Sequence, residues 1–109
     1  MKVAEIVVRI LEDEGITDAF GIPGAGINPV YQYLGTSTKI KHYTVRHEEA
    51  AVHAADGYFR ASGKMAMAIC TSGPGATNFI TGINIPNCSN FEYCIFKSYK
   101  TESEVCLSI

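Results

Sequence analysis

The sequence predicts an α/β domain in which helices cover both faces of a parallel β-sheet. Segments with helical periodicity alternate along the chain with short apolar or β-prone runs, in the order helix, strand, helix, strand, helix, strand, helix. One of these runs, Met65–Cys70, is almost wholly apolar, which is typical of a strand that is buried on both faces. Glycine-rich turns follow two of the predicted strands. Such alternation implies parallel strands joined by right-handed crossovers.

Length and composition are those of a single folded domain. The chain has 109 residues, and 47% of them are hydrophobic, which is enough to build a core. The net charge of -2 argues against a nucleic-acid partner, and no apolar run is long enough to cross a membrane. The four cysteines form no C-x-x-C pair, so neither a zinc nor a redox motif is supported, and a reduced, cytoplasmic protein is expected.

The first element is an amphipathic helix from about Val3 to Glu14. Its apolar residues recur at helical spacing, and charged residues occupy most of the other side. The apolar positions are Val3, Val7, Ile10 and Leu11. Gly15 follows as the expected C-terminal cap. This helix is therefore expected to cover one face of the sheet.

The first glycine-rich loop, Gly21–Gly26, follows a short apolar run, Ala19–Ile22, that predicts the first strand. Glycines permit positive φ and let a ligand approach the backbone closely. Asn28 and Pro29 then predict the N-cap and the first residue of a helix that includes Leu34. The loop has neither the G-x-G-x-x-G spacing nor the lysine of a P-loop, so an ordinary tight turn is the simpler interpretation of this loop alone.

An acidic pair, Glu48 and Glu49, lies between the second predicted strand, His42–Val45, and a helix that extends to about Ser62. Gly63 is the expected end of this helix. One helix face is formed by residues that are mostly small enough for close packing, namely Ala51, Ala54, Ala55 and Tyr58. From spacing alone, acids in a first helical turn most simply complement the helix dipole. The alternative is that one of these acids takes part in acid–base catalysis on a bound ligand.

The third strand, Met65–Cys70, leads into a second glycine-rich loop, Thr71–Asn78, that opens a helix through about Asn84. Cys70 is expected to be a buried small hydrophobe rather than a nucleophile. Ligands of parallel sheets bind at the carboxyl ends of the strands, where both loops and Glu48 are expected to lie. This convergence favours a functional role for Glu48.

Three motifs, in this order and at this spacing, resemble those of thiamine-diphosphate-dependent enzymes. They are Phe20–Gly24, Arg46–Glu48 with Ala54–Tyr58, and Thr71–Asn78. Among these enzymes the chain is most similar to the catalytic large subunit of acetolactate synthase (acetohydroxyacid synthase), over about residues 1–83. The stretch Gly24–Pro29 also resembles glyoxylate carboligase, which lacks the acid that corresponds to Glu48.

The resemblance implies that residues 1–84 are part of a flavodoxin-like pyrimidine-binding domain for thiamine diphosphate. It makes Glu48 the catalytic residue, which hydrogen-bonds N1′ of the aminopyrimidine and so promotes loss of the thiazolium C2 proton, with Glu49 as its solvated neighbour. Such a carboxyl must be partly buried, because desolvation lets it share a proton with the ring nitrogen. The further cofactor-binding residues that the resemblance implies are Pro23, Gly24, Ala25, Gly26, Gly73, Pro74 and Asn78.

The activity implied by the resemblance is decarboxylation of a 2-keto acid such as pyruvate and condensation with a second keto acid, in branched-chain amino-acid biosynthesis. In these enzymes a different domain, usually of the partner subunit, holds the diphosphate and Mg²⁺ through a Gly-Asp-Gly…Asn motif. Acetolactate synthases also bind FAD in a central domain, and this sequence carries neither feature. The full-length enzyme is therefore expected to be a homo-oligomer with the cofactor at the subunit interface, and the isolated chain is expected to be inactive.

Residues 85–109 depart from the family pattern and are expected to form a divergent, less ordered tail that arose by truncation or a frame shift. Two β-prone stretches, Tyr93–Phe96 and Val105–Ile109, predict strands within this tail. The competing interpretations of the whole chain are a non-catalytic α/β binding or assembly module derived from such an enzyme, and a glyoxylate-carboligase-like enzyme. The sequence does not indicate a substrate preference.

Overall fold

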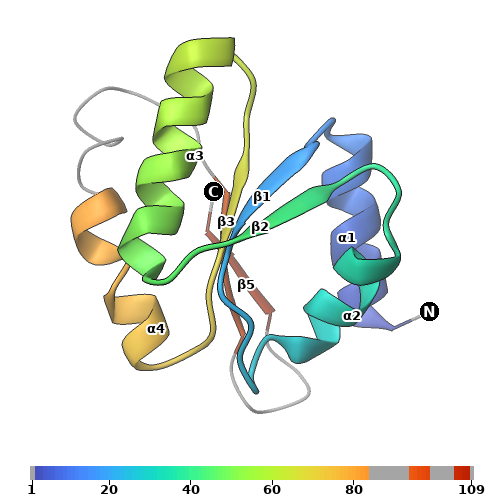
Figure 1. The fold of residues 1–109 in the computed structure, drawn as a ribbon. Coiled ribbons are helices and arrows are strands. Elements are labelled where there is room, and N and C mark those ends of the chain that lie inside the picture. Colours follow the sequence, from blue (N-terminus) through green and yellow to red (C-terminus); the bar gives the residue numbers. More distant parts are fainter. Residues whose placement is uncertain (1, 84–93, 99–104, 109) are drawn as a thin grey trace.

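The computed structural model describes residues 2–83, 94–98 and 105–108, and it confirms an α/β fold with a central, mainly parallel sheet (Figure 1). The strands are β1 (Asp18–Gly21), β2 (Lys41–Thr44), β3 (Met67–Ile69), β4 (Cys94–Ser98) and β5 (Val105–Ser108). Their spatial order is β2-β1-β3-β4-β5, which is the order of flavodoxin-like sheets. β1 pairs in parallel with β2 and β3, and β3 pairs in parallel with β4, whereas β5 is an antiparallel edge strand.

Helices cover both faces of this sheet. They are α1 (Val3–Asp13), α2 (Asn28–Thr36), α3 (Glu48–Ser62) and α4 (Pro74–Thr77). α1 and α2 pack against one face, and α3 and α4 lie on the other (Figure 1). A further helical turn follows at 80–83. Across the described part of the chain, no helix is both long enough and apolar enough to cross a membrane.

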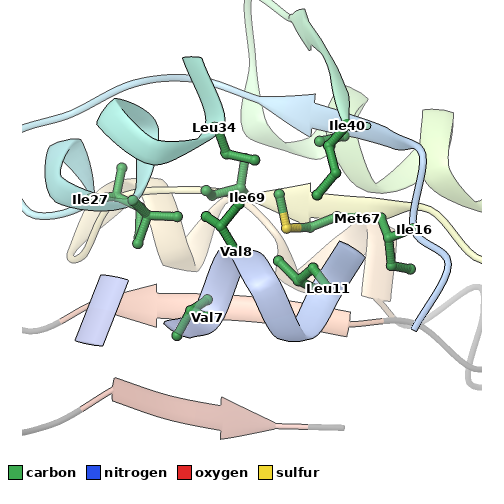
Figure 2. Packing of buried hydrophobic residues seen from close by; sticks show 11 residues of the cluster. Val7, Val8, Leu11, Ile16, Ile27, Leu34, Ile40, Met67 and Ile69 are labelled. Atoms are coloured by element: carbon green, nitrogen blue, oxygen red, sulfur yellow. The ribbon is translucent and has the colours of Figure 1, made fainter. Parts of the chain in front are cut away.

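Strand β3 separates two hydrophobic cores, which explains why its sequence is apolar throughout. Met67 and Ile69 join a cluster with α1 and α2 that includes Leu11 (Figure 2). Ala68 and Cys70 belong to the opposite cluster, which packs against α3. These four residues, in β3 and just after it, are at most 2% exposed, and each large side chain buried in this way contributes about 1.5–3 kcal/mol to stability. The predictions of a doubly buried strand and a buried Cys70 are therefore confirmed.

The core-facing side of α1 differs from the prediction. Val7, Val8 and Leu11 are buried, whereas Val3 and Ile10 are 55% and 47% exposed. Because each residue turns the side-chain direction by about 100°, Val3 and Ile10 lie about a quarter turn from the centre of the buried stripe. The prediction was wrong at these two positions because apolar residues at helical spacing occupy two adjacent stripes, and only one of them meets the sheet.

Some element boundaries also shift. α2 begins at Asn28, one residue earlier than predicted, and Ile27 in the cap position makes no side-chain cap hydrogen bond. Asn28 is therefore the first helical residue rather than the N-cap. β2 begins at Lys41, also one residue early. α3 has the predicted bounds and ends at Gly63, whose φ of 70° is in the left-handed region that favours glycine.

The helix predicted from the second glycine-rich loop through about Asn84 is interrupted. α4 ends at Thr77, residues 78 and 79 form a turn, and the chain becomes helical again at 80. The break allows Phe79, which is 1% exposed, to enter the core beside α3. β4 and β5 confirm strands in both β-prone stretches of the tail. The rest of the predicted tail, at 85–93, 99–104 and 109, lies outside the described residues.

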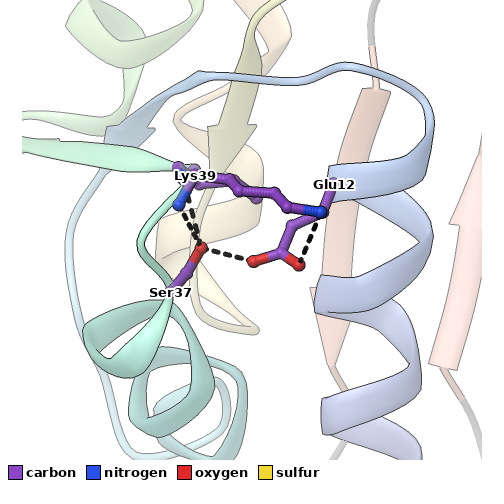
Figure 3. A network of polar contacts seen from close by, with 4 residues as sticks. Glu12, Ser37 and Lys39 are labelled. Atoms are coloured by element: carbon purple, nitrogen blue, oxygen red, sulfur yellow. Dashed lines mark hydrogen bonds and ion pairs between the residues drawn. The ribbon is translucent and has the colours of Figure 1, made fainter.

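A polar network fastens the loop between α2 and β2 to α1 (Figure 3). Ser37 Oγ donates to Glu12 Oε1 at 2.5 Å, and Lys39 Nζ lies 4.0 Å from Glu12 Oε2. Ser37 Oγ in turn accepts the backbone N–H groups of Lys39 and Ile40. These contacts hold the start of β2 in place. They therefore also help to position its carboxyl end, which is followed by α3.

Candidate functional site

Glu48 is the first residue of α3, just beyond the carboxyl end of β2. The backbone N–H of Val45 donates to the carbonyl of Gly21 at 3.1 Å, which ties the end of β2 to the first glycine-rich loop. His47 caps α3, because its Nδ1 accepts the backbone N–H of Glu49 at 3.2 Å. The strand end and the cap together fix the direction in which the Glu48 side chain leaves the helix.

The Glu48 carboxylate reaches the second glycine-rich loop. Asn78 Nδ2 donates to Glu48 Oε2 at 2.9 Å, and both side chains are half-buried. This contact joins the start of α3 to the segment that follows β3, although the two residues are 30 positions apart. Glu48 therefore lies between elements that follow two different strands, as the parallel topology predicts.

Two glycines pack closely against side chains near this carboxylate. A Cβ atom at Gly75 would lie 3.3 Å from Glu48 Oε1 and 3.1 Å from Thr71 Cγ2. A Cβ atom at Gly24, in the first glycine-rich loop, would lie 2.6 Å from Thr71 Cβ. The first loop therefore approaches Thr71 more closely than a side chain at Gly24 would allow, and a side chain at Gly75 would crowd Thr71 and Glu48. We call Glu48, Gly75, Thr71 and Gly24 the carboxylate cradle.

The structure brings some of the predicted site residues together and places others at the surface. Glu48 and Asn78 are hydrogen-bonded, and Gly24 lies against Thr71. Gly26 is half-buried, and the exposed positions of the two loops are Pro23, Ala25, Gly73 and Pro74. Gly73 has a φ of 75°, so this turn requires glycine.

Sequence reasoning misses two members of the cradle, Thr71 and Gly75. Both lie inside the motif Thr71–Asn78, but their importance depends on contact with a distant loop and with Glu48. The sequence offers one indication, the second glycine of Gly-Pro-Gly, because a glycine often marks a position where another group packs closely against the backbone.

Glu49 extends along its own helix rather than into the cradle. Its Oε1 lies 3.2 Å from His53 Nε2, one helical turn further on. The Glu49 side chain is 39% exposed, so it is partly solvated as well as paired with His53. The two adjacent glutamates therefore have different partners, Asn78 for Glu48 and His53 for Glu49.

Asp18, another acidic side chain, lies at the amino end of β1 and belongs to the fold rather than to the cradle. Thr17 Oγ1 and Tyr58 OH donate to Asp18 Oδ2 at 2.7 and 2.8 Å. The Thr17 hydrogen bond is the largest influence on the pKa of Asp18, which lies below its ordinary value despite the opposing effect of desolvation. Within residues 2–83, 94–98 and 105–108, no group of three or more His, Cys, Asp or Glu side chains could hold a metal ion.

Known proteins are similar to this chain in sequence. The chain matches the family described as "Thiamine pyrophosphate enzyme, N-terminal TPP binding domain" over residues 1–90. It is 54% identical over 80 residues to the acetolactate synthase large subunit of Haemophilus influenzae, and 54% identical over 80 residues to the acetolactate synthase isozyme 3 large subunit of Escherichia coli. A probable acetolactate synthase large subunit of Methanocaldococcus jannaschii is 51% identical over 83 residues.

These matches cover 73–76% of this chain and 14% of each of the three relatives, so the chain spans a small part of their length. The family match, by contrast, extends over most of the chain, from residue 1 to residue 90. The chain therefore belongs to the thiamine pyrophosphate enzyme family and carries its N-terminal TPP-binding domain.

Proposed function

We propose that this chain is the pyrimidine-binding part of an acetolactate-synthase-like enzyme, in which Glu48 contacts the aminopyrimidine ring of thiamine diphosphate. The observation that carries the proposal is the carboxylate cradle, where Glu48 Oε1 faces the position that a Cβ atom of Gly75 would occupy, 3.3 Å away. The names of the relatives support the reaction class.

The residues of the cradle suit an aminopyrimidine. A ring nitrogen needs a carboxyl group that can share a proton with it, and Glu48 supplies one. A flat ring also needs an approach that side chains do not block, and the half-buried Gly24 carries no side chain. Because Glu48 is half-buried, a hydrogen bond between its carboxyl group and a ligand is stronger than the same bond in water.

The part played by the chain itself is to orient the pyrimidine and to hold a proton at Glu48. The first glycine-rich loop would line one side of the ring through Pro23, Ala25 and Gly26, and the exposed Gly73 and Pro74 would line the other. When bound, thiamine diphosphate supplies a nucleophilic thiazolium carbon and an electron sink for decarboxylation of a 2-keto acid such as pyruvate.

The remaining parts of the enzyme are assigned by the resemblance to acetolactate synthases. A different domain, from a partner subunit in a homo-oligomer, would bind the diphosphate and Mg²⁺. A central domain would bind FAD. Such an enzyme would serve branched-chain amino-acid biosynthesis in the cytoplasm, by condensing two 2-keto acids after one of them has lost its carboxylate.

A chimeric enzyme tests this proposal. Residues 1–83 replace the matching segment of the Escherichia coli relative, with which the chain is 54% identical over 80 residues. We expect the chimera to form acetolactate from pyruvate, Glu48→Gln to remove most of that activity, and Glu49→Gln to retain it. A folded chimera that keeps full activity after Glu48→Gln would contradict the proposal.

The isolated chain provides a second test. We expect it to form no acetolactate from pyruvate, thiamine diphosphate and Mg²⁺, because contact with the pyrimidine alone leaves the charged end of the cofactor unanchored. Turnover above that of a Glu48→Ala control would contradict this expectation. A chimera that folds but is inactive with Glu48 present would instead favour a non-catalytic α/β binding or assembly module.

A further inference from the structure

Asn78 contacts the candidate catalytic side chain itself. Its Nδ2 donates to Glu48 Oε2 at 2.9 Å. An ionised carboxylate contains only acceptors, so the chemistry also fixes which end of the Asn78 amide faces it. Both side chains are half-buried, where a hydrogen bond to a charged group is stronger than at the surface.

The other oxygen of Glu48 has different surroundings. Oε1 lies 3.3 Å from the position that a Cβ atom of Gly75 would occupy, so it packs closely beside the buried backbone of Gly75. Oε2 accepts a hydrogen bond from Asn78, whereas Oε1 lies beside the backbone of Gly75. Two residues of one loop, Gly75 and Asn78, therefore make the two carboxylate oxygens chemically different.

We propose that Asn78 is a positioning residue that keeps Glu48 Oε2 as an acceptor and confines the exchangeable proton of Glu48 to Oε1. This inference rests on the proposed function. An N–H donor favours the unprotonated form of the oxygen that it contacts, so a proton gained by Glu48 goes to Oε1. Transfer of that proton to a ring nitrogen of the ligand leaves Glu48 ionised and still bonded to Asn78, and the return of the proton reverses the step.

The core holds Asn78 in place independently of its bond to Glu48. The next residue, Phe79, is 1% exposed and packs in the cluster beside α3. A Cβ atom at Gly82 would lie 2.7 Å from Val52 Cβ, so the following helical turn lies directly on α3. Both contacts fix the backbone at Asn78 against the helix that carries Glu48, so the alignment of the two side chains is built into the fold.

NMR of the 109-residue chain tests the contact itself. The side-chain N–H resonances of Asn78 should shift when the pH is lowered enough to protonate Glu48, and Glu48→Gln should abolish this shift. Thr77→Ala is a matched control, because Thr77 Oγ1 donates to the carbonyl of Pro74 in the same loop, and the shift should persist in it. Asn78 resonances that do not respond to Glu48 would overturn the inference, whatever happens to the proposed function.

Exchange of the cofactor C2 proton in the chimera tests the positioning role. Asn78→Asp keeps the size of the side chain and removes the donor, and Asn78→Ala removes the whole amide. We expect each variant to slow exchange about tenfold or more, and Thr77→Ala to leave the rate unchanged. Circular dichroism confirms that each variant is folded before the rates are compared.

The outcomes of this experiment separate the two proposals. If Glu48→Gln slows exchange but both Asn78 variants exchange at the parental rate, the positioning role is overturned and the proposed function stands. If Glu48→Gln is also without effect, the proposed function fails as well. Slow exchange in both Asn78 variants, with the parental rate in Thr77→Ala, supports the inference.

Discussion

The Tyr31 hydroxyl lies 2.9 Å from Nε2 of His42, so that α2 is fastened to β2. The two rings meet edge-on, with their centroids 4.8 Å apart. Burial lowers the pKa of His42 and raises the pKa of Tyr31, which favours a neutral imidazole beside an intact hydroxyl. α2 follows the first glycine-rich loop, and β2 leads to Glu48. The contact between Tyr31 and His42 therefore joins the two segments that position Gly24 and Glu48.

We predict that His42 makes the stability of the chain depend on pH. A histidine whose folded-state pKa lies below its ordinary value of 6.5 binds fewer protons in the folded state than in the unfolded state. Its contribution to the free energy of unfolding is therefore full above pH 6.5 and is lost as the pH falls through the folded-state pKa. Urea unfolding from about pH 8 to about pH 5 measures this dependence.

Two variants separate the histidine from its partner. His42→Gln should flatten the pH dependence in this range, because the titrating group is gone. Tyr31→Phe should lower the free energy of unfolding at neutral pH by about 0.5–1.5 kcal/mol, because it removes one hydrogen bond. The same pH profile in the parent chain and in His42→Gln would show that other groups govern it.

Gly21 and Gly57 should respond to alanine in opposite ways. A Cβ atom at Gly21 would lie 2.1 Å from the Ile69 carbonyl oxygen in β3, so alanine must displace the paired strand. We expect Gly21→Ala to lower the free energy of unfolding by about 1–3 kcal/mol or more. Gly57 lies exposed in α3 with nothing within 4 Å of its Cβ position, so Gly57→Ala should stabilise the chain by about 0.5–1 kcal/mol. Similar effects in urea unfolding would contradict the close packing of β1 on β3.

Gly75→Ala should weaken ligand binding without unfolding the chain. The added methyl group would stand 3.3 Å from Glu48 Oε1 and 3.1 Å from Thr71 Cγ2, contacts that small shifts of these side chains can relieve. We expect a change in stability of no more than about 1 kcal/mol. In the chimera, the Kd for thiamine diphosphate, measured by calorimetry, should rise about tenfold, since the methyl group would push aside the Glu48 carboxylate that is proposed to contact the ring. Unaltered binding would place the ligand elsewhere.

The sheet and the gathering of Glu48 with both glycine-rich loops are predictable from the sequence. Apolar periodicity identifies the alternating elements, and parallel topology brings the carboxyl ends of neighbouring strands to one edge. The contact of Gly24 with Thr71 is not predictable, because it depends on how closely two distant loops approach. The break at Asn78 is missed for a similar reason, since the burial of Phe79 against α3 is a tertiary contact that helical propensity does not encode.

The buried face of α1 was also not predictable from the sequence alone. Val3 and Ile10 satisfy helical spacing as well as Val7 and Leu11 do, yet they remain exposed. Spacing defines which residues share a stripe, whereas the position of the sheet decides which stripe is buried. The direction of Glu49 is likewise set by a local partner, His53, that the family resemblance did not indicate.

We expect Glu48, and not Glu49, to face the ligand. NMR tests this directly, by measuring exchange of the C2 proton of thiamine diphosphate in the chimera. Glu48→Gln should slow exchange sharply, because the amide has nearly the same size but cannot exchange a proton with N1′. Glu49→Gln should do much less, because that carboxylate pairs with His53 on its own helix. Acids that act only through the helix dipole would each contribute about 0.3–1 kcal/mol to stability and would behave alike. Equal and small effects of the two variants on exchange would contradict the assignment of Glu48.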